Sequence, residues 1–329
     1  MNTHPLPIVL VSHSLPDGWL KLLENRCRMI LGPPEGDHLT EQLESCLPNA
    51  EGLFTLLTIK VDDHLLSRAP KLKVVSNMAV GFDNIDVEAC SRRGIPVGNT
   101  PGVLTDGTAD LTMAIMLAAA RNLFEANLDA RQGRWTTWSP TGWLGRDLKG
   151  ATLGIVGLGQ IGTAVARRAV GFGMNIVFFD PHPNADLAKE LGAQHVEFQK
   201  LLHVADFVSL HIPLTPKTRH LINVSALKTM KPTALLINTS RGPIVDQDAL
   251  FQALKHNWIG GAALDVTDPE PLPPNHELYS LSNCLIVPHI GSATWNTRRS
   301  MAERACENLL AGLDGRVLPY CVNPEVYQE

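Results

Sequence analysis

Residues 153–168 read LGIVGLGQIGTAVARR, and this stretch decides the fold. Its first four residues form a short apolar run typical of a buried strand, and its alanine-rich end favours a helix. Between the two lies the pattern G-x-G-x-x-G. In this setting Gly157 makes the tight turn, Gly159 lets a pyrophosphate approach the backbone, and Gly162 permits close helix–strand packing. The stretch therefore predicts the dinucleotide-binding turn of an α/β domain.

The residues around this turn indicate which nucleotide would bind. Residues 163–168 open a helix, whose free N–H groups and positive dipole end favour phosphate, and Gln160 and Ile161 of the turn are expected to contact the cofactor. A glycine turn can also occur without a ligand, but Asp180 ends the next apolar run, 176–179, where this fold places an acid. A carboxylate there accepts hydrogen bonds from ribose hydroxyls and repels a 2′-phosphate. We therefore expect NAD(H), while His182 leaves NADP(H) open.

Short apolar runs alternate with helix-length segments on both sides of the turn, as in parallel sheets covered by helices. A long helix is expected over 105–131 and a final helix over 294–313. The pattern predicts an α/β fold of two doubly wound, Rossmann-like domains with parallel sheets, joined by long helices. The expected strands lie at 8–11, 52–56, 73–76, 153–156, 176–179, 207–210, 234–237, 261–264 and 285–287.

The composition excludes several classes of protein. Hydrophobic residues make up 44% of the 329 residues and charged residues 19%, as in a globular protein. A net charge of -5 offers no basic field for nucleic acid. The six cysteines show no zinc spacing, so we expect reduced thiols and no metal site. Without a signal-peptide pattern or an apolar stretch of about 20 residues, the chain is expected to be cytoplasmic and not to bind membranes.

Three further segments bring functional groups to the ends of predicted strands, where open α/β sheets bind ligands. They are Ser240-Arg241-Gly242, Pro269-Glu270-Pro271 and Pro288-His289-Ile290-Gly291-Ser292. Taken singly, the arginine could form a surface ion pair, the glutamate could be a loop acid, and the histidine could cap a helix. Together with the glycine turn, the three indicate an active site.

With these motifs in this order, the chain resembles the D-isomer-specific 2-hydroxyacid dehydrogenase family over essentially its whole length. Within the family it is most similar to glyoxylate/hydroxypyruvate reductases, including the 2-ketogluconate reductase type. The resemblance implies hydride transfer from NAD(P)H to a small 2-keto acid, giving a D-2-hydroxy acid. It implies that Arg241 binds the carboxylate, that His289 is the general acid, and that Glu270 orients His289 and favours its protonated form.

The resemblance also implies the remaining contacts of the site. The cofactor would contact Pro213, Thr239, Asp265 and Gly291. The substrate would contact Leu56, the backbone N–H groups of Val80 and Gly81, and Trp138 from the partner subunit of a homodimer. That tryptophan belongs to a loop, 135–143, with three tryptophans in nine residues. Such a loop is either tucked against the surface or forms an interface arm.

The domain assignment follows the same resemblance. Residues 1–100 and 288–329 would form the substrate-binding domain, and 101–287 the NAD-binding domain, with 121–150 as a dimerisation arm. Two other functions stay open. One is reduction of bulkier acids such as 2-ketogluconate, since one sequence does not give pocket dimensions. The other is an NAD(H)-sensing corepressor, a binding protein of the same fold, which the lack of an extended disordered tail disfavours.

Overall fold

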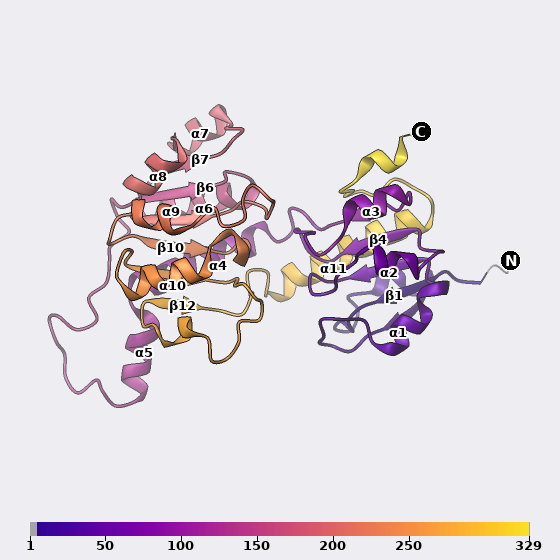
Figure 1. Cartoon of the computed structure of the whole chain (residues 1–329), viewed down its shortest axis with the longest axis horizontal. Coiled ribbons are helices and arrows are strands. Elements are labelled where there is room, and N and C mark those ends of the chain that lie inside the picture. The colour runs from indigo at the N-terminus through magenta and orange to yellow at the C-terminus, as the bar shows by residue number, and fades with distance from the viewer. Residues whose placement is uncertain (1–4, 329) are drawn as a thin grey trace. The chain divides into compact units, whose positions relative to one another are not determined.

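The protein divides into two compact units in the computed structural model, which describes residues 5–328. Unit 1 comprises Met1–Leu104 and Ala293–Glu329, and unit 2 comprises Thr105–Ser292. Each is built around a parallel sheet (Figure 1), which confirms the predicted α/β fold of two Rossmann-like units. Within residues 5–328, no helix is both long and apolar enough to cross a membrane.

Unit 1 contains a sheet of five parallel strands covered by short helices. The strands are β1 (Ile8–Val11), β2 (Arg28–Leu31), β3 (Gly52–Thr55), β4 (Val74–Asn77) and β5 (Val97–Gly98), and the helices include α1 (Glu41–Cys46), α2 (Asp63–Ser67) and α3 (Val87–Arg92). Their order in the sheet is β2-β1-β3-β4-β5. Leu10, Leu53 and Val75 are fully buried on the central strands, as expected for a sheet with both faces covered. Short 3-10 helices lie at Lys21–Leu23, Leu47–Asn49 and Pro324–Tyr327.

Helix α11 (Trp295–Leu313) completes unit 1 from the far end of the chain. It begins where Thr294 accepts a hydrogen bond from the N–H of Thr297, a side-chain cap that the predicted start at 294 anticipates. It lies beside β4, where Ser76 Oγ donates to the carbonyl oxygen of Ala305 at 2.7 Å (Figure 1). These two residues are 229 positions apart, so unit 1 is assembled from both ends of the chain.

Unit 2 contains a sheet of seven parallel strands. They are β6 (Thr152–Val156), β7 (Asn175–Phe179), β8 (Gln194–His195), β9 (Phe207–Leu210), β10 (Leu235–Asn238), β11 (Gly261–Leu264) and β12 (Cys284–Ile286). The order β12-β11-β10-β9-β6-β7-β8 reverses direction between β6 and β9. Open α/β sheets bind ligands beyond the carboxyl ends of their strands at such a switch point. The glycine turn follows β6, so this edge is where a dinucleotide is expected.

The helices of unit 2 cover both faces of this sheet. They are α4 (Thr105–Ala120), α5 (Leu123–Arg131), α6 (Gln160–Gly171), α7 (Ala185–Leu191), α8 (Phe198–Val204), α9 (Val224–Thr229) and α10 (Gln247–Lys255), with 3-10 helices at Gly242–Ile244 and Glu277–Ser280. The single long helix predicted over 105–131 is wrong. Asn122, with φ of 48°, separates α4 from α5, and its Nδ2 donates to the carbonyl oxygen of Leu144 at 2.9 Å. Asparagine adopts this left-handed conformation more easily than most residues, which explains the corner.

Candidate active site

The glycine turn has the geometry that a dinucleotide requires. Gly157 has φ of +91°, and a Cβ there would lie 2.6 Å from the carbonyl oxygen of His211. A Cβ on Gly162 would lie 2.1 Å from the carbonyl oxygen of Gly157, so helix α6 packs directly on the turn. By contrast, a Cβ on Gly159 would meet nothing within 4 Å. The backbone at Gly159 is therefore open to a pyrophosphate. Gly157 and Gly162 are glycines because a Cβ at either position would clash with a backbone carbonyl oxygen.

The start of α6 adds a second anion-binding feature. Gly159 is the N-cap residue, and within the described chain no side chain caps the helix. The first N–H groups of an α-helix have no acceptor inside the helix, and Gln160 and Ile161 provide two of them. The helix dipole adds partial positive charge at the same point. The residues present thus fit the phosphates of a dinucleotide.

Asp180 lies at the end of β7 and braces the same turn. Its Oδ2 accepts a hydrogen bond from the N–H of Leu158, and its Oδ1 accepts one from the N–H of His182, both at 2.9 Å. Each carboxylate oxygen has a second lone pair. The carboxylate is therefore held rigidly by the backbone and can still accept a ribose hydroxyl. No arginine or lysine lies among residues 181–185.

His289 and Glu270 form the pair that the sequence predicted. Nδ1 of His289 is hydrogen-bonded to Oε1 of Glu270, and about a quarter of the histidine side chain, 27%, is exposed. The backbone of His289 has φ of 51°, and its N–H donates to the carbonyl oxygen of Asp265 at 2.9 Å. A non-glycine residue in this region is held there by its surroundings, as often happens at functional sites. Because Glu270 occupies Nδ1, Nε2 is the ring nitrogen that can exchange a proton with a substrate.

Arg241 follows β10 in a turn tied to its surroundings by hydrogen bonds. Asn238 Nδ2 donates to the carbonyl oxygen of Arg241 at 2.9 Å, and Nη1 of Arg241 donates to the carbonyl oxygen of Ser240 at 2.8 Å. Ser240 Oγ in turn donates to the carbonyl oxygen of Ile212. Asn238 is 1% exposed, and sequence reasoning missed its role. The sequence could have indicated this role, because Asn238 is an amide side chain directly after the apolar run 235–237.

The turn of Arg241 packs against the loop that carries Glu270. A Cβ on Gly242 would lie 1.8 Å from the carbonyl oxygen of Thr267, so the two backbones are in direct contact. Thr267 in turn donates its N–H to Oε2 of Glu270 at 3.5 Å. Cis peptide bonds precede both Pro269 and Pro271 in this loop. The contact brings together the loops of two catalytic candidates that are 29 positions apart in the sequence.

Asp265 holds the loop that carries His289 through hydrogen bonds to its backbone. It is 2% exposed, and its carboxylate accepts hydrogen bonds from the N–H groups of Ile290 at 2.6 Å and Gly291 at 2.8 Å. Burial raises the pKa of Asp265, although those two N–H groups and the nearby His289 oppose the shift. The side chain of Asp265 therefore fixes the backbone that follows His289. Contact with the nicotinamide, which the resemblance implied for Asp265, stays a prediction.

The other predicted cofactor residues lie on the same edge of the unit 2 sheet. Thr239 directly follows β10, and its Oγ1 shares a hydrogen bond of 2.9 Å with Thr112 Oγ1 on α4. Pro213 follows β9 by three residues, and its carbonyl oxygen accepts from Thr218 Oγ1 at 2.7 Å. Between β9 and Pro213, burial lowers the pKa of His211 to about 4, which keeps that ring neutral at physiological pH.

The predicted substrate residues are distributed differently. Leu56, Val80 and Gly81 belong to unit 1, where they follow the carboxyl ends of β3 and β4. Trp138 belongs to unit 2, and 79% of its surface is exposed. Among residues 5–328, the Trp138 side chain makes no hydrogen bond or ring contact, so this structure does not bring it to the catalytic trio.

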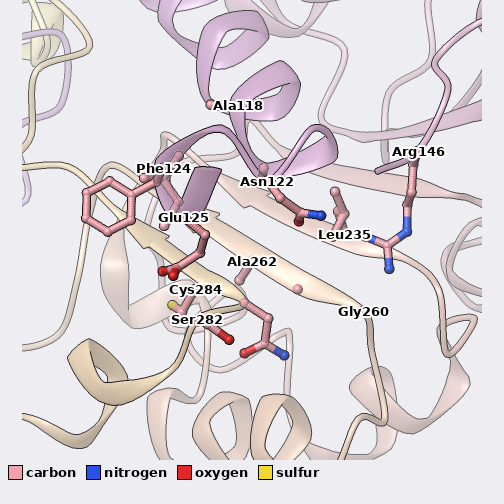
Figure 2. Close-up of a pocket in the computed structure, with 14 residues that line it drawn as sticks. Ala118, Asn122, Phe124, Glu125, Arg146, Leu235, Gly260, Ala262, Ser282 and Cys284 are labelled. Carbon is pink, nitrogen blue, oxygen red and sulfur yellow. The ribbon is translucent and has the colours of Figure 1, made fainter. Parts of the chain in front are cut away.

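A pocket opens at the other end of the same strands (Figure 2). Leu235 and Gly261 line it at the starts of β10 and β11, and Figure 2 shows Phe124 and Arg146 on opposite sides of it. The catalytic candidates follow the carboxyl ends of these strands, whereas the pocket lies at their amino ends. It is therefore not the catalytic site. It adjoins the corner between α4 and α5.

Comparison with known proteins decides which family this arrangement belongs to. Residues 113–291 match the family described as "D-isomer specific 2-hydroxyacid dehydrogenase, NAD binding domain". The chain is also 47% identical over 325 residues to a glyoxylate reductase of Korarchaeum cryptofilum, covering 97% of each chain. The chain belongs to the D-isomer-specific 2-hydroxyacid dehydrogenase family.

Solved structures agree with this assignment. The TT0316 protein of Thermus thermophilus superimposes with a TM-score of 0.90 and 46% identity, over 96% of this dehydrogenase and 99% of that chain. A second structure is an NADPH-dependent glyoxylate/hydroxypyruvate reductase of Sinorhizobium meliloti in complex with NADP and malonate. It superimposes with a TM-score of 0.84 and 31% identity, over 97% of both chains. This dehydrogenase thus uses a nicotinamide cofactor, which its glycine turn and α6 are shaped to bind.

Proposed function

We propose that this 2-hydroxyacid dehydrogenase reduces glyoxylate, hydroxypyruvate and similar small 2-keto acids to D-2-hydroxy acids, with NADH as the reductant. The observation that carries the proposal is the His289–Glu270 pair, on the same edge of the unit 2 sheet as the glycine turn. The choice of substrate is supported by the glyoxylate reductases that the chain matches over nearly its whole length.

The chemistry of reduction assigns a task to each side chain. When bound, the reduced nicotinamide supplies a hydride to C2 of the keto acid. The C2–O double bond becomes a single bond, and its oxygen takes the proton from Nε2 of His289. Glu270 stabilises the protonated imidazole before transfer and holds its orientation. Arg241 binds the substrate carboxylate with its planar guanidinium group and places positive charge near the developing alkoxide.

The preference for NADH rests on Asp180. Its carboxylate is fixed by two backbone N–H groups at the end of β7, where the adenosine ribose of a bound dinucleotide lies in this fold. A 2′-phosphate would place a second negative group beside it. The Sinorhizobium reductase shows that a related enzyme uses NADP, so the preference of this chain needs its own measurement.

A homodimer is the second part of the proposal. The segment 121–150 exposes large apolar side chains: Leu123 and Phe124 are each 59% exposed, Trp135 62%, Trp138 79% and Leu144 69%. Apolar surface of this extent within thirty residues is typical of an interface. Burial lowers the pKa of Arg146 in the adjoining pocket, and its guanidinium bonds no acceptor within residues 5–328. A second copy that covers this region would give these side chains partners.

A panel of 2-keto acids, assayed with NADH and with NADPH, tests the activity. We expect glyoxylate and hydroxypyruvate to give the highest kcat/KM, and His289→Gln to lower kcat by about 100-fold or more. His203→Gln is the matched control, because His203 is an exposed histidine on α8, and it should leave kcat unchanged. Faster turnover of 2-ketogluconate than of glyoxylate, or a near-normal kcat for His289→Gln, would contradict the proposal.

Sedimentation of the purified protein tests the dimer. We expect a dimer at micromolar concentration and a higher KM for glyoxylate in Trp138→Ala. A fully active monomer would exclude both the interface and the contribution of Trp138 to the site.

A further inference from the structure

The loop after β4 contains two adjacent backbone N–H groups that are unused within the protein. Within residues 5–328, neither the N–H of Val80 nor that of Gly81 donates to a protein acceptor. The resemblance to the dehydrogenase family predicts that both groups contact the substrate, and we take its carboxylate as their ligand. Two N–H groups bind a carboxylate well only if both point the same way before it arrives. The structure shows what orients them.

The carbonyl groups of the same two peptides are tied to one neighbouring segment, residues 99–100. The carbonyl oxygen of Ala79 accepts a hydrogen bond from the N–H of Thr100 at 2.9 Å. That of Val80 accepts one from Nδ2 of Asn99 at 2.8 Å. In a planar trans peptide, the C=O and N–H groups point in opposite directions. Both N–H groups are therefore directed away from residues 99–100.

Asn99 is itself held firmly, so its side chain can position the loop. Its N–H donates to the carbonyl oxygen of Tyr320 at 3.2 Å, and its own carbonyl oxygen accepts from Nδ2 of Asn308 at 2.9 Å. Asn308 is fully buried on α11. On the other side of the loop, Asn77 Nδ2 donates to the carbonyl oxygen of Gly81 at 2.9 Å. Three successive carbonyl groups of the loop are thus fixed from within unit 1.

Unsatisfied polar atoms also gather at this loop. Among the described residues, the buried side-chain oxygens without a hydrogen-bond partner are Oδ1 of Asn77 and Oγ1 of Thr100. Both residues are fully buried, and both take part in fixing the loop. Folded proteins leave few such atoms, and each calls for an explanation such as a functional role.

We propose that Asn99 is a positioning residue for the substrate carboxylate, acting through the Val80–Gly81 peptide. Its side chain does not touch the substrate in this mechanism. It holds the Val80 carbonyl group so that the Gly81 N–H faces the ligand. This inference rests on the proposed function, because it assumes that a 2-keto acid binds at this loop.

Asn99→Ala tests the inference directly. Without the amide, the Val80–Gly81 peptide can rotate, and the carboxylate loses one aligned donor. We expect KM for glyoxylate to rise about 10-fold, kcat to change less than about threefold, and the Kd of NADH to stay unchanged. The control is Asn323→Ala. Asn323 is a buried asparagine of unit 1 whose amide bonds the backbone of Val97 and Ile95 instead.

The outcomes separate positioning from general stability. A rise in KM for Asn99→Ala, and for the nearly isosteric Asn99→Leu, without one for Asn323→Ala supports the proposal. A KM within twofold of the wild type in a folded Asn99 variant overturns it, as does an equal rise in Asn323→Ala. If neither Asn99 variant folds while Asn323→Ala does, Asn99 is structural and the proposal is wrong. A wild-type enzyme that reduces no 2-keto acid would instead refute the proposed function.

Discussion

Because Gly242 packs directly against the backbone of Thr267, we expect Gly242→Ala to impair catalysis. Gly242→Ala would place a Cβ 1.8 Å from the carbonyl oxygen of Thr267, whereas real Cβ contacts essentially never fall below 3.0 Å. The two backbones must therefore separate by about 1.2 Å. No flexible side chain can absorb this change, since the nearest atoms all belong to the backbone of residues 267–268. The displacement falls on Arg241 on one side and on the Glu270 loop on the other.

The kinetic cost follows from that displacement. Misplacing a catalytic group by about 1 Å can lower the rate by about 100-fold, so we expect kcat/KM for glyoxylate to fall by that order. The assay is steady-state oxidation of NADH, with NADH affinity measured separately by fluorescence. Affinity for NADH should change less than kcat/KM, because the glycine turn after β6 keeps its own contacts.

Gly171→Ala is the matched control for this experiment. Gly171 ends α6, and a Cβ there would meet nothing within 4 Å. Alanine at this position should leave both kcat/KM and stability close to those of the wild type. If Gly242→Ala retains more than about a third of wild-type kcat/KM, the two loops are not held by this contact and the reasoning fails.

Three further predictions concern charge. Asp180→Ser should narrow or reverse the ratio of kcat/KM for NADH over NADPH, and a wild-type preference for NADPH would exclude the role given to Asp180. Glu270→Gln should lower kcat for reduction, because His289 loses the carboxylate that holds its ring; an unchanged kcat would count against the pair. His211 has its pKa lowered from 6.5 to about 4 by burial, so the unfolded chain binds its proton first as pH falls. Stability should therefore decline between pH 6.5 and 4, by at most about 2 kcal/mol at pH 5, and urea unfolding of His211→Gln should lack that part of the decline.

The elements that local pattern predicts well are those whose burial is complete. Strands β1, β9 and β11 have the predicted bounds, because each is a short apolar run buried on both sides. Strands β2, β5 and β8 were missed. β8 is two exposed polar residues, and β2 lies at a sheet edge with charged Arg28 at its start. All three missed strands lie at a sheet edge, where a strand is paired on one side only.

The residues of the candidate site also differ in how far the sequence alone could indicate them. Gly157, Gly162, Glu270 and His289 could be named as candidates in advance because each belongs to a contiguous motif. Asn99 could not, because its role depends on the Val80 carbonyl group, 19 positions away, and that pairing exists only after the fold has formed. The Gly242–Thr267 contact was hidden for the same reason.

The division of unit 1 between the two ends of the chain has a consequence for synthesis. On the ribosome, residues 1–104 emerge first, yet α11, which packs on β3 and β4, emerges only after all of unit 2. About 200 residues separate Leu104 from the end of α11. At about 5–20 residues per second, the apolar face of β3 and β4 that α11 covers therefore stays exposed for about 10–40 seconds. Unit 2 is one continuous segment and can fold in that interval. The first hundred residues are thus the part of the nascent chain most in need of a chaperone.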